Sequence, residues 1–425
     1  MKYFVFFAIF LSTTVSVLSQ ELPPENIGMP VGDGITDDTT AIQQLLDGPN
    51  TKVYLPPPSK CYLISKPLRM HSDQTLHLDP NTVIRLADGA MQYMLVNDDT
   101  ENGNRNIQVI GGIWDGNNLT QTCDYHQGVK GSEPYDPNRY LGCIMLFINV
   151  ENLRIEKLTI KDPETFAINL AKVRWFTVQD ITFDFNQKRG NMDGVHVQGG
   201  SQHGTITNLK GDTNDDMVAL NADDANMFEI TQGSITDIQV DGLFCTNGYT
   251  AVRLNSAGHP VKRVRISNIF GSFRYNGVSL THHNVHPGAP TVFEDILIDG
   301  VFMAKQLEEG VKPEPWNEAA RRSHAIVWVA STAQVDHLSI KNLSRREWML
   351  DSSPTLQIDA KANVKQLHLS DVLQVNHVET PLKLIANEGT IEQIFVNGVT
   401  VRDAKTEPIT GSGSVEKVFG EIVVE

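Results

Sequence analysis

The sequence has few cysteines, a shortage of basic residues and no long hydrophobic run after its first twenty residues. Because no later segment approaches about 18 uninterrupted apolar residues, we predict no membrane-spanning helix in the mature chain. The 35 basic residues are outnumbered by 51 acidic ones, which gives a net charge of −16. This charge repels nucleic acid and anionic membranes, so neither is an expected partner.

The four cysteines exclude a dense disulfide framework and lie at positions 61, 123, 143 and 245. Their spacing matches no zinc site, and we expect neither a metal nor a cofactor. Cys123 and Cys143 flank a loop-like stretch and are the preferred disulfide pair. Buried free thiols are the alternative.

Residues 1–19 predict a secretory signal peptide. A lysine-bearing start, MKYF, precedes the apolar run VFFAIFLSTTVSVLS, which is too short and too rich in hydroxyls to cross a bilayer. Val17 and Ser19 satisfy the preference for small residues before a cleavage site. We therefore expect the mature chain to begin at Gln20, to form one domain over 20–425, and to act outside the cytoplasm as a secreted or periplasmic monomer.

A short pattern recurs along the chain, in which two alternating apolar residues and a polar residue precede Asn, Asp or Gly and another aliphatic. Its copies are IQVIGGIW at 107, FTVQDITF at 176, GTITNLKG at 204, IQVDGLFC at 238, VRISNIFG at 264, ILIDGVFM at 296, LSIKNLSR at 338, LHLSDVLQ at 367 and IFVNGVTV at 394. Short alternating strands at a period of roughly 20–50 residues are typical of a solenoid. Asn, Asp and Gly tolerate the left-handed backbone that a corner between strands requires. The pattern predicts an all-β solenoid of parallel rungs, whereas a propeller or sandwich would need more hairpin signals.

A second series of short apolar runs lies out of phase with the first. FAINL, GVHV, MVAL, AVRL and GVSL each place two aliphatic residues two positions apart, beginning at Ile168, Val195, Val218, Val252 and Val278. Since strand side chains alternate between faces, each pair is predicted to point inward and the residue between them outward. The predicted outward column is Asn169, His196, Ala219, Arg253 and Ser279.

Three acids precede two of these runs. Asp193 lies two residues before Val195, Asp216 lies two before Val218, and Asp215 adjoins Asp216. Asp193 and Asp216 are 23 residues apart, about one coil, so stacked rungs would bring the acids together. Clustered carboxylates raise the proton affinity of one member, which suits the acid and base of glycoside hydrolysis. Turn residues or ligands of a structural cation are the alternative roles.

The motifs NMDG and NDDMVALN resemble the Asn-Thr-Asp and Asp-Asp signatures of glycoside hydrolase family 28, the polygalacturonases and rhamnogalacturonases. The resemblance implies a right-handed, single-stranded parallel β-helix of the pectin-lyase type and hydrolysis with inversion. It assigns the general acid to Asp216, and assigns the positioning and deprotonation of water to Asp193 and Asp215. VGDGITDDTTAIQQLLDG also resembles the N-terminal cap of such proteins, a helix that begins near 36–38 and ends at Gly48.

Two further signatures of that family are missing. NGYTAVRL has Tyr249 and Thr250 where the family has a histidine, and NGVSLTHH has Ser279 and Thr281 where the family has Arg-x-Lys. A uronic acid would lose charge-assisted contacts at the second position, unless Arg253 replaces them. The sugar is otherwise expected to be neutral.

The expected substrate is a polysaccharide or an oligosaccharide. The candidate substrate-binding side chains surround the acids or follow them by one or two coils. They are Asn191, His196, Tyr249, Arg253 and His282. A calcium-dependent polysaccharide lyase and a glycan-binding module without activity are the competing hypotheses. Residues 308–322 form a proline-broken insertion that is expected to be either a wall of the cleft or a surface excursion.

Overall fold

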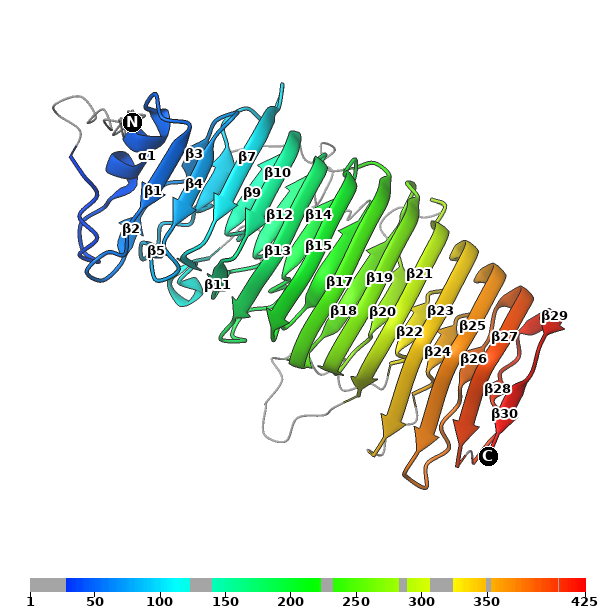
Figure 1. Ribbon diagram of the computed structural model, residues 1–425. Coiled ribbons are helices and arrows are strands. Elements are labelled where there is room, and N and C mark those ends of the chain that lie inside the picture. Colours follow the sequence, from blue (N-terminus) through cyan, green and yellow to red (C-terminus); the bar gives the residue numbers. More distant parts are fainter. Residues whose placement is uncertain are drawn as a thin grey trace, which may run out of the picture.

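The chain folds into a long stack of parallel coils, seen in a computed structural model that describes residues 28–122, 140–222, 232–282, 289–305, 324–348, 353–403 and 405–425. Figure 1 shows the strands following one another from the blue N-terminal end to the red C-terminal end. Each strand pairs in parallel with a strand one coil away. The fold is the expected right-handed parallel β-helix.

One sheet is made of short strands and carries the second apolar series of the sequence. Its strands are β3 (Leu68–Met70), β6 (Leu95–Asn97), β9 (Met145–Ile148), β12 (Ile168–Ala171), β14 (Val195–Gln198), β16 (Asp216–Asn221), β18 (Thr250–Asn255), β20 (Val278–Thr281), β22 (Val327–Val329), β24 (Leu356–Ile358), β26 (Ile385–Asn387) and β28 (Ile409–Thr410). We call it the short-strand sheet.

The other sheet contains the longer strands and most of the recurring octets. Its strands are β1 (Lys52–Leu55), β2 (Tyr62–Ile64), β4 (Thr75–Leu78), β5 (Val83–Leu86), β7 (Asn104–Ile110), β8 (Ile113–Asp115), β10 (Val150–Glu156), β11 (Thr159–Lys161), β13 (Arg174–Asp184), β15 (Gln202–Gly211), β17 (Ile235–Gly248), β19 (Val261–Phe273), β21 (Val292–Ala304), β23 (Gln334–Glu347), β25 (Asn363–Asn376), β27 (Thr390–Arg402), β29 (Ser414–Phe419) and β30 (Ile422–Val424). A 3-10 turn, η1 (Asn118–Thr120), follows β8.

Each long strand from β13 onward bends at a residue with a left-handed backbone. The φ angles at the eight predicted corner positions lie between 51° and 85°, from Asp180 to Gly398. Polar corner residues also form hydrogen bonds to neighbouring coils. For example, the Asn342 amide donates to Asp299 Oδ1 at 2.8 Å. The structure confirms these corners, but all eight lie inside a continuous strand and do not separate two strands.

The core runs through the middle of the stack. All five predicted inward pairs are fully buried, and the register places Ile168, Val195, Val218, Val252 and Val278 one above another. Aliphatic stacking of this kind removes apolar surface from water in every coil, at about 25 cal/mol per Å². It fixes the register, because a slip by one residue would turn the apolar side chains outward.

Helix α1 (Thr39–Asp47) covers the N-terminal end of the core, with Ile42 and Leu46 fully inside it. The helix ends before Gly48, as predicted, but Asp38 caps no helical N–H. Its carboxylate instead accepts the backbone N–H groups of Val31 and Gly32 at 2.6 and 3.0 Å. Among the described residues, no helix has the length and apolar character needed to cross a membrane.

Candidate active site

Three acids meet at the start of two neighbouring strands of the short-strand sheet. Asp193 precedes β14, and Asp216 begins β16 directly after Asp215. The backbone N–H of Gly194 donates to the Asp216 carbonyl at 2.9 Å, which ties the two coils together. Met217 and Val218 both enter the core, so the usual alternation breaks here and Asp216 faces the same side as Arg253. Asp193 and Asp216 are only 2% and 1% exposed.

Burial and mutual repulsion favour the protonated forms of these acids. Burial, followed by the charge of Asp215, raises the pKa of Asp193 to about 7, although the hydrogen bond from His196 opposes the shift. Burial also raises the pKa of Asp216 well above its usual value; Arg253 opposes this rise, while Asp215 and Asp193 add to it. Asp215 is more accessible, with 19% of its side chain exposed, and its Oδ1 accepts the N–H of Asp216. The site therefore holds two buried acids whose protonated forms are favoured, and Asp193 exchanges its proton near neutral pH.

Arg253 supplies a positive charge inside this group. Its Nε lies 3.0 Å from Asp216 Oδ2, and its Nη2 lies 4.0 Å from Asp215 Oδ1. Burial disfavours the charged guanidinium, but the two acids outweigh burial and raise the Arg253 pKa. Arg253 is consequently a permanent cation whose charge the acids already balance.

His196 is held on three sides. Its Nδ1 lies 2.7 Å from Asp193 Oδ2, and the amide nitrogen of Asn221 lies 3.0 Å from its Nε2. Since that amide nitrogen donates to Nε2, Nδ1 carries the proton that is given to Asp193. The Phe166 ring stacks on the imidazole with centroids 3.9 Å apart. His196 therefore orients Asp193, and both residues are buried.

Aromatic side chains form the more accessible side of the site. Tyr249 and Tyr275 stack with centroids 4.5 Å apart, and His324 lies 3.8 Å from Tyr275. Trp328 meets Tyr275 edge-on at 6.5 Å, and its indole N–H donates to Asp359. All four rings are partly exposed. We call Tyr249, Tyr275, His324 and Trp328 the aromatic wall.

The remaining predicted residues are less closely associated with the acids. Asn191 is half-buried just before Asp193 and has a left-handed backbone. His282 lies at the end of β20, where its Nε2 meets the Ser331 carbonyl at 2.9 Å. Residues 1–19, Cys123 and the whole 308–322 insertion lie outside the described residues. The cysteine pairing is therefore untested, although Cys143 itself is buried.

Sequence reasoning missed four side chains of the site. Phe166 and Asn221 fix His196, whereas His324 and Trp328 complete the aromatic wall. Trp328 had a usable signal, because Val327 and Val329 flank it with the inward spacing of the earlier runs and place it in register with Ser279. The others depend on contacts between coils that no local pattern reveals.

Several buried polar atoms of the outward face have no hydrogen-bond partner in the structure. Among them are Asp216 Oδ1, Thr250 Oγ1, Asn169 Oδ1 and both amide atoms of Gln198. An unsatisfied buried group costs about 1–3 kcal/mol, so such atoms gather where water or a ligand completes the bonding. Within the described ranges, no three His, Cys, Asp or Glu side chains are grouped suitably for a metal ion.

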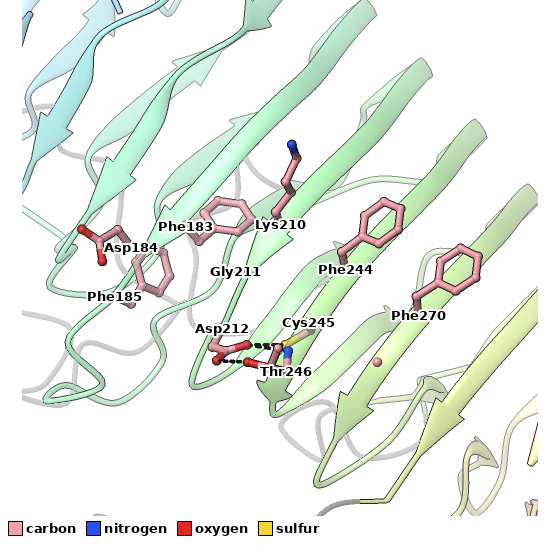
Figure 2. A pocket seen from close by; sticks show the side chains of 11 residues that line it. Phe183, Asp184, Phe185, Lys210, Gly211, Asp212, Phe244, Cys245, Thr246 and Phe270 are labelled. Atoms are coloured by element: carbon pink, nitrogen blue, oxygen red, sulfur yellow. Dashed lines mark hydrogen bonds between the residues drawn. The ribbon is translucent and has the colours of Figure 1, made fainter. Parts of the chain in front are cut away.

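A surface cavity lies close to the segment that leads to Asp215 and Asp216. It measures about 520 Å³ and is lined by Phe183, Phe185, Phe244, Phe270 and Asp212, among others (Figure 2). The carboxylate of Asp212 accepts hydrogen bonds from Thr246 N and Oγ1 at 2.7 Å and from Cys245 Sγ at 3.1 Å. Burial opposes ionisation, but the bonds from Thr246 and Cys245 lower the pKa of Asp212. Asp212 thus anchors the corner before the acids to the next coil.

Sequence comparison relates the chain to one enzyme family. Residues 65–269, which include the acids, match the model of "Glycosyl hydrolases family 28". A polygalacturonase of Gossypium barbadense is 25% identical over 274 residues, which are 63% of this chain and 60% of the relative. An exopolygalacturonase of Arabidopsis thaliana is 24% identical over 46% of this chain and 41% of its own length. The matched region thus spans about three fifths or less of these relatives.

Structural comparison supports the same architecture. The family 28 exopolygalacturonase of Yersinia enterocolitica aligns with a TM-score of 0.56 and 15% identity, over 94% of this chain and 78% of that one. A tailspike mutant of an E. coli bacteriophage aligns with a TM-score of 0.57 and 12% identity, over 93% and 77%. These identities establish the fold alone. Together with the sequence match, they confirm the predicted resemblance to family 28.

Proposed function

We propose that this divergent relative of family 28 is a glycoside hydrolase that cleaves a pectin-like polysaccharide or its fragments with inversion. The observation that carries the proposal is the group of three carboxylates on adjacent coils, of which Asp193 and Asp216 are buried and have raised pKa values. A binding module has no use for crowded buried acids, because their repulsion costs folding free energy. We further propose a secreted or periplasmic monomer with residues 20–425 as the catalytic domain.

The proposed acid is Asp216. Burial keeps it protonated, and its Oδ1 has no hydrogen-bond partner, whereas Oδ2 lies against Arg253. The Oδ1 hydroxyl would give its proton to the glycosidic oxygen as the bond to the anomeric carbon breaks. Arg253 would then stabilise the carboxylate that remains.

The proposed bases are Asp193 and Asp215. They would position a water on the opposite face of the sugar and accept its proton as the new C–O bond forms. His196 donates to Asp193 Oδ2 and so holds one carboxylate oxygen in place, while the other oxygen would act on the water. The products are one hemiacetal with inverted configuration and one alcohol, and the proton lost by water replaces the proton given by Asp216.

Product analysis tests the proposal. We expect incubation with pectic, algal and α-glucan polysaccharides to release reducing ends from one class without an ultraviolet-absorbing product. Proton NMR at early times should show the anomer opposite to that of the substrate. An unsaturated product that disappears with a chelator would instead establish a lyase, and binding without any product would establish a module.

A further inference from the structure

We infer that the accessible side of the site binds a neutral sugar residue through the aromatic wall and does not bind a uronate. This inference rests on the proposed hydrolase function and concerns the same cleft. It depends on three features of the described residues: the cations beside the acids, the balance of charge, and the rings that are exposed.

The cation nearest the acids is already paired. Arg253 contacts Asp216 at 3.0 Å and Asp215 at 4.0 Å, so its charge is compensated before any substrate arrives. Arg274 and Lys305, which adjoin the wall, donate to the backbone carbonyls of Asn247 and Tyr275. In the coil after Arg253, the outward side chains of β20 are the uncharged Ser279 and Thr281.

The charge balance also opposes a uronate. A uronate carboxylate would lie beside the carboxylate of Asp215 and the buried acids Asp193 and Asp216, and it would compete with Asp215 for the Arg253 guanidinium. Bringing a further anion into a poorly solvated acidic group is unfavourable, because like charges repel strongly where water is scarce. A neutral sugar avoids this repulsion.

The wall offers contacts that suit a neutral ring. Trp328 follows Ser279 in the outward column, two coils from Arg253, and its indole is partly exposed. An aromatic face contacts the C–H groups of a sugar without requiring charge. Tyr249 and Tyr275 add phenol hydroxyls, which burial keeps protonated by raising their pKa values. Those hydroxyls can donate to or accept from sugar hydroxyls.

A matched pair of ligands tests this inference. Pectic oligosaccharides would be compared with the same oligosaccharides after chemical reduction of every carboxyl group to a primary alcohol, which preserves length and linkage. We expect the reduced form to bind the wild-type protein at least tenfold more tightly by titration calorimetry, or to show that ratio in kcat/KM where cleavage occurs. Equal or tighter binding of the native form would overturn the inference, and so would binding of neither.

The same experiment separates the two proposals. Preference for the native form with cleavage would leave the hydrolase function intact and remove only the neutral-sugar inference. Preference for the reduced form without cleavage of any substrate would support the neutral-sugar inference and remove the proposed hydrolase function.

Substitution of the wall locates the site. Trp328→Ala should weaken binding of the reduced oligosaccharide about tenfold, whereas Trp328→Phe should retain most of it, because Phe keeps a stacking ring but loses the bond to Asp359. Trp175→Ala is the matched control: Trp175 is 58% exposed and also stacks on a histidine, but it lies on the long-strand sheet. Equal effects of Trp328→Ala and Trp175→Ala would contradict the inference.

Discussion

The outward face of the short-strand sheet has two regions with opposite character. Around β6, β9 and β12 it is covered by an apolar cluster of Tyr93, Val96, Tyr140, Leu141, Cys143, Leu146, Ile148, Phe166 and Ala171. Around β14 to β20 the equivalent positions carry Asp193, His196, Asp216, Arg253 and Ser279. The inward residues of β9, β12, β14, β16, β18 and β20 are apolar and buried. The inward residues therefore stabilise the coils in both regions, whereas the outward residues determine where catalysis is possible.

At the boundary between the two regions, an aromatic ring of the apolar cluster contacts the imidazole of the acidic region. Phe166 belongs to the apolar cluster and stacks on His196, which holds Asp193. Leu146 and Asn169 lie beyond this contact and are buried. The apolar cluster thus borders the site and supports it through the contact of Phe166 with His196.

The largest expected effect comes from neutralising the proposed acid. Asp216→Asn should lower kcat by about a thousandfold, within the range of roughly 10² to 10⁴ for a general acid, because an amide cannot donate a carboxyl proton. Circular dichroism should be unchanged, since Asp216 faces away from the aliphatic core. Asp371→Asn is the control. Asp371 occupies a left-handed corner of the long-strand sheet, and asparagine occupies other corners of that sheet. Wild-type turnover in Asp216→Asn would rule out the proposed acid.

The boundary contact should couple stability to activity. Phe166→Ala should lower the free energy of unfolding by about 3 kcal/mol as a cavity opens, and should lower kcat about tenfold as His196 loses its stacking partner. Leu146 lies in the same cluster but is two strands away from His196, so Leu146→Ala should lower stability and leave kcat unchanged. Urea denaturation and initial rates measure both quantities. A loss of kcat in Leu146→Ala equal to that in Phe166→Ala would show that the cluster acts only through general stability.

The acidic region should also make stability depend on pH. The pKa of Asp193 rises on folding from about 3.8 to about 7, so between these values the folded state keeps a proton that the unfolded state releases. Stability is then greatest below the lower value, is lost as pH rises through the window, and is constant above it, with a total change on the order of 4 kcal/mol. Urea midpoints at pH 5 and pH 8 should show the decrease, and Asp193→Asn should reduce it. An equal pH dependence in the variant would contradict the burial of this proton.

The same comparison explains what the sequence could and could not predict. The inward pairs were predictable, because strand alternation places residues two positions apart on the same face. The left-handed corners were predictable, because each depends on the backbone angle of one residue. Stacking of Asp193 beside Asp216 followed from the coil length. The outward column was correctly aligned, yet four of its five residues are buried, which the alternation alone does not predict. Partners of His196 such as Phe166 and Asn221 come from other coils, and no local pattern encodes that choice.

The smallest effect is expected far from both regions, at a corner of the long-strand sheet. Asn208 has φ of 55°, and its amide donates to Asp180 on the coil before. Asn208→Ala and Asn208→Gly both lose that bond, but only alanine places a Cβ in the left-handed conformation, which costs about 1–2 kcal/mol. Gly242 fills the same corner one coil later, so the ladder itself tolerates glycine. Asn208→Ala should therefore be less stable than Asn208→Gly by about 1 kcal/mol in urea denaturation, with kcat unchanged in both. Equal stabilities would mean that the corner residues are retained for their side-chain bonds and not for their backbone angle.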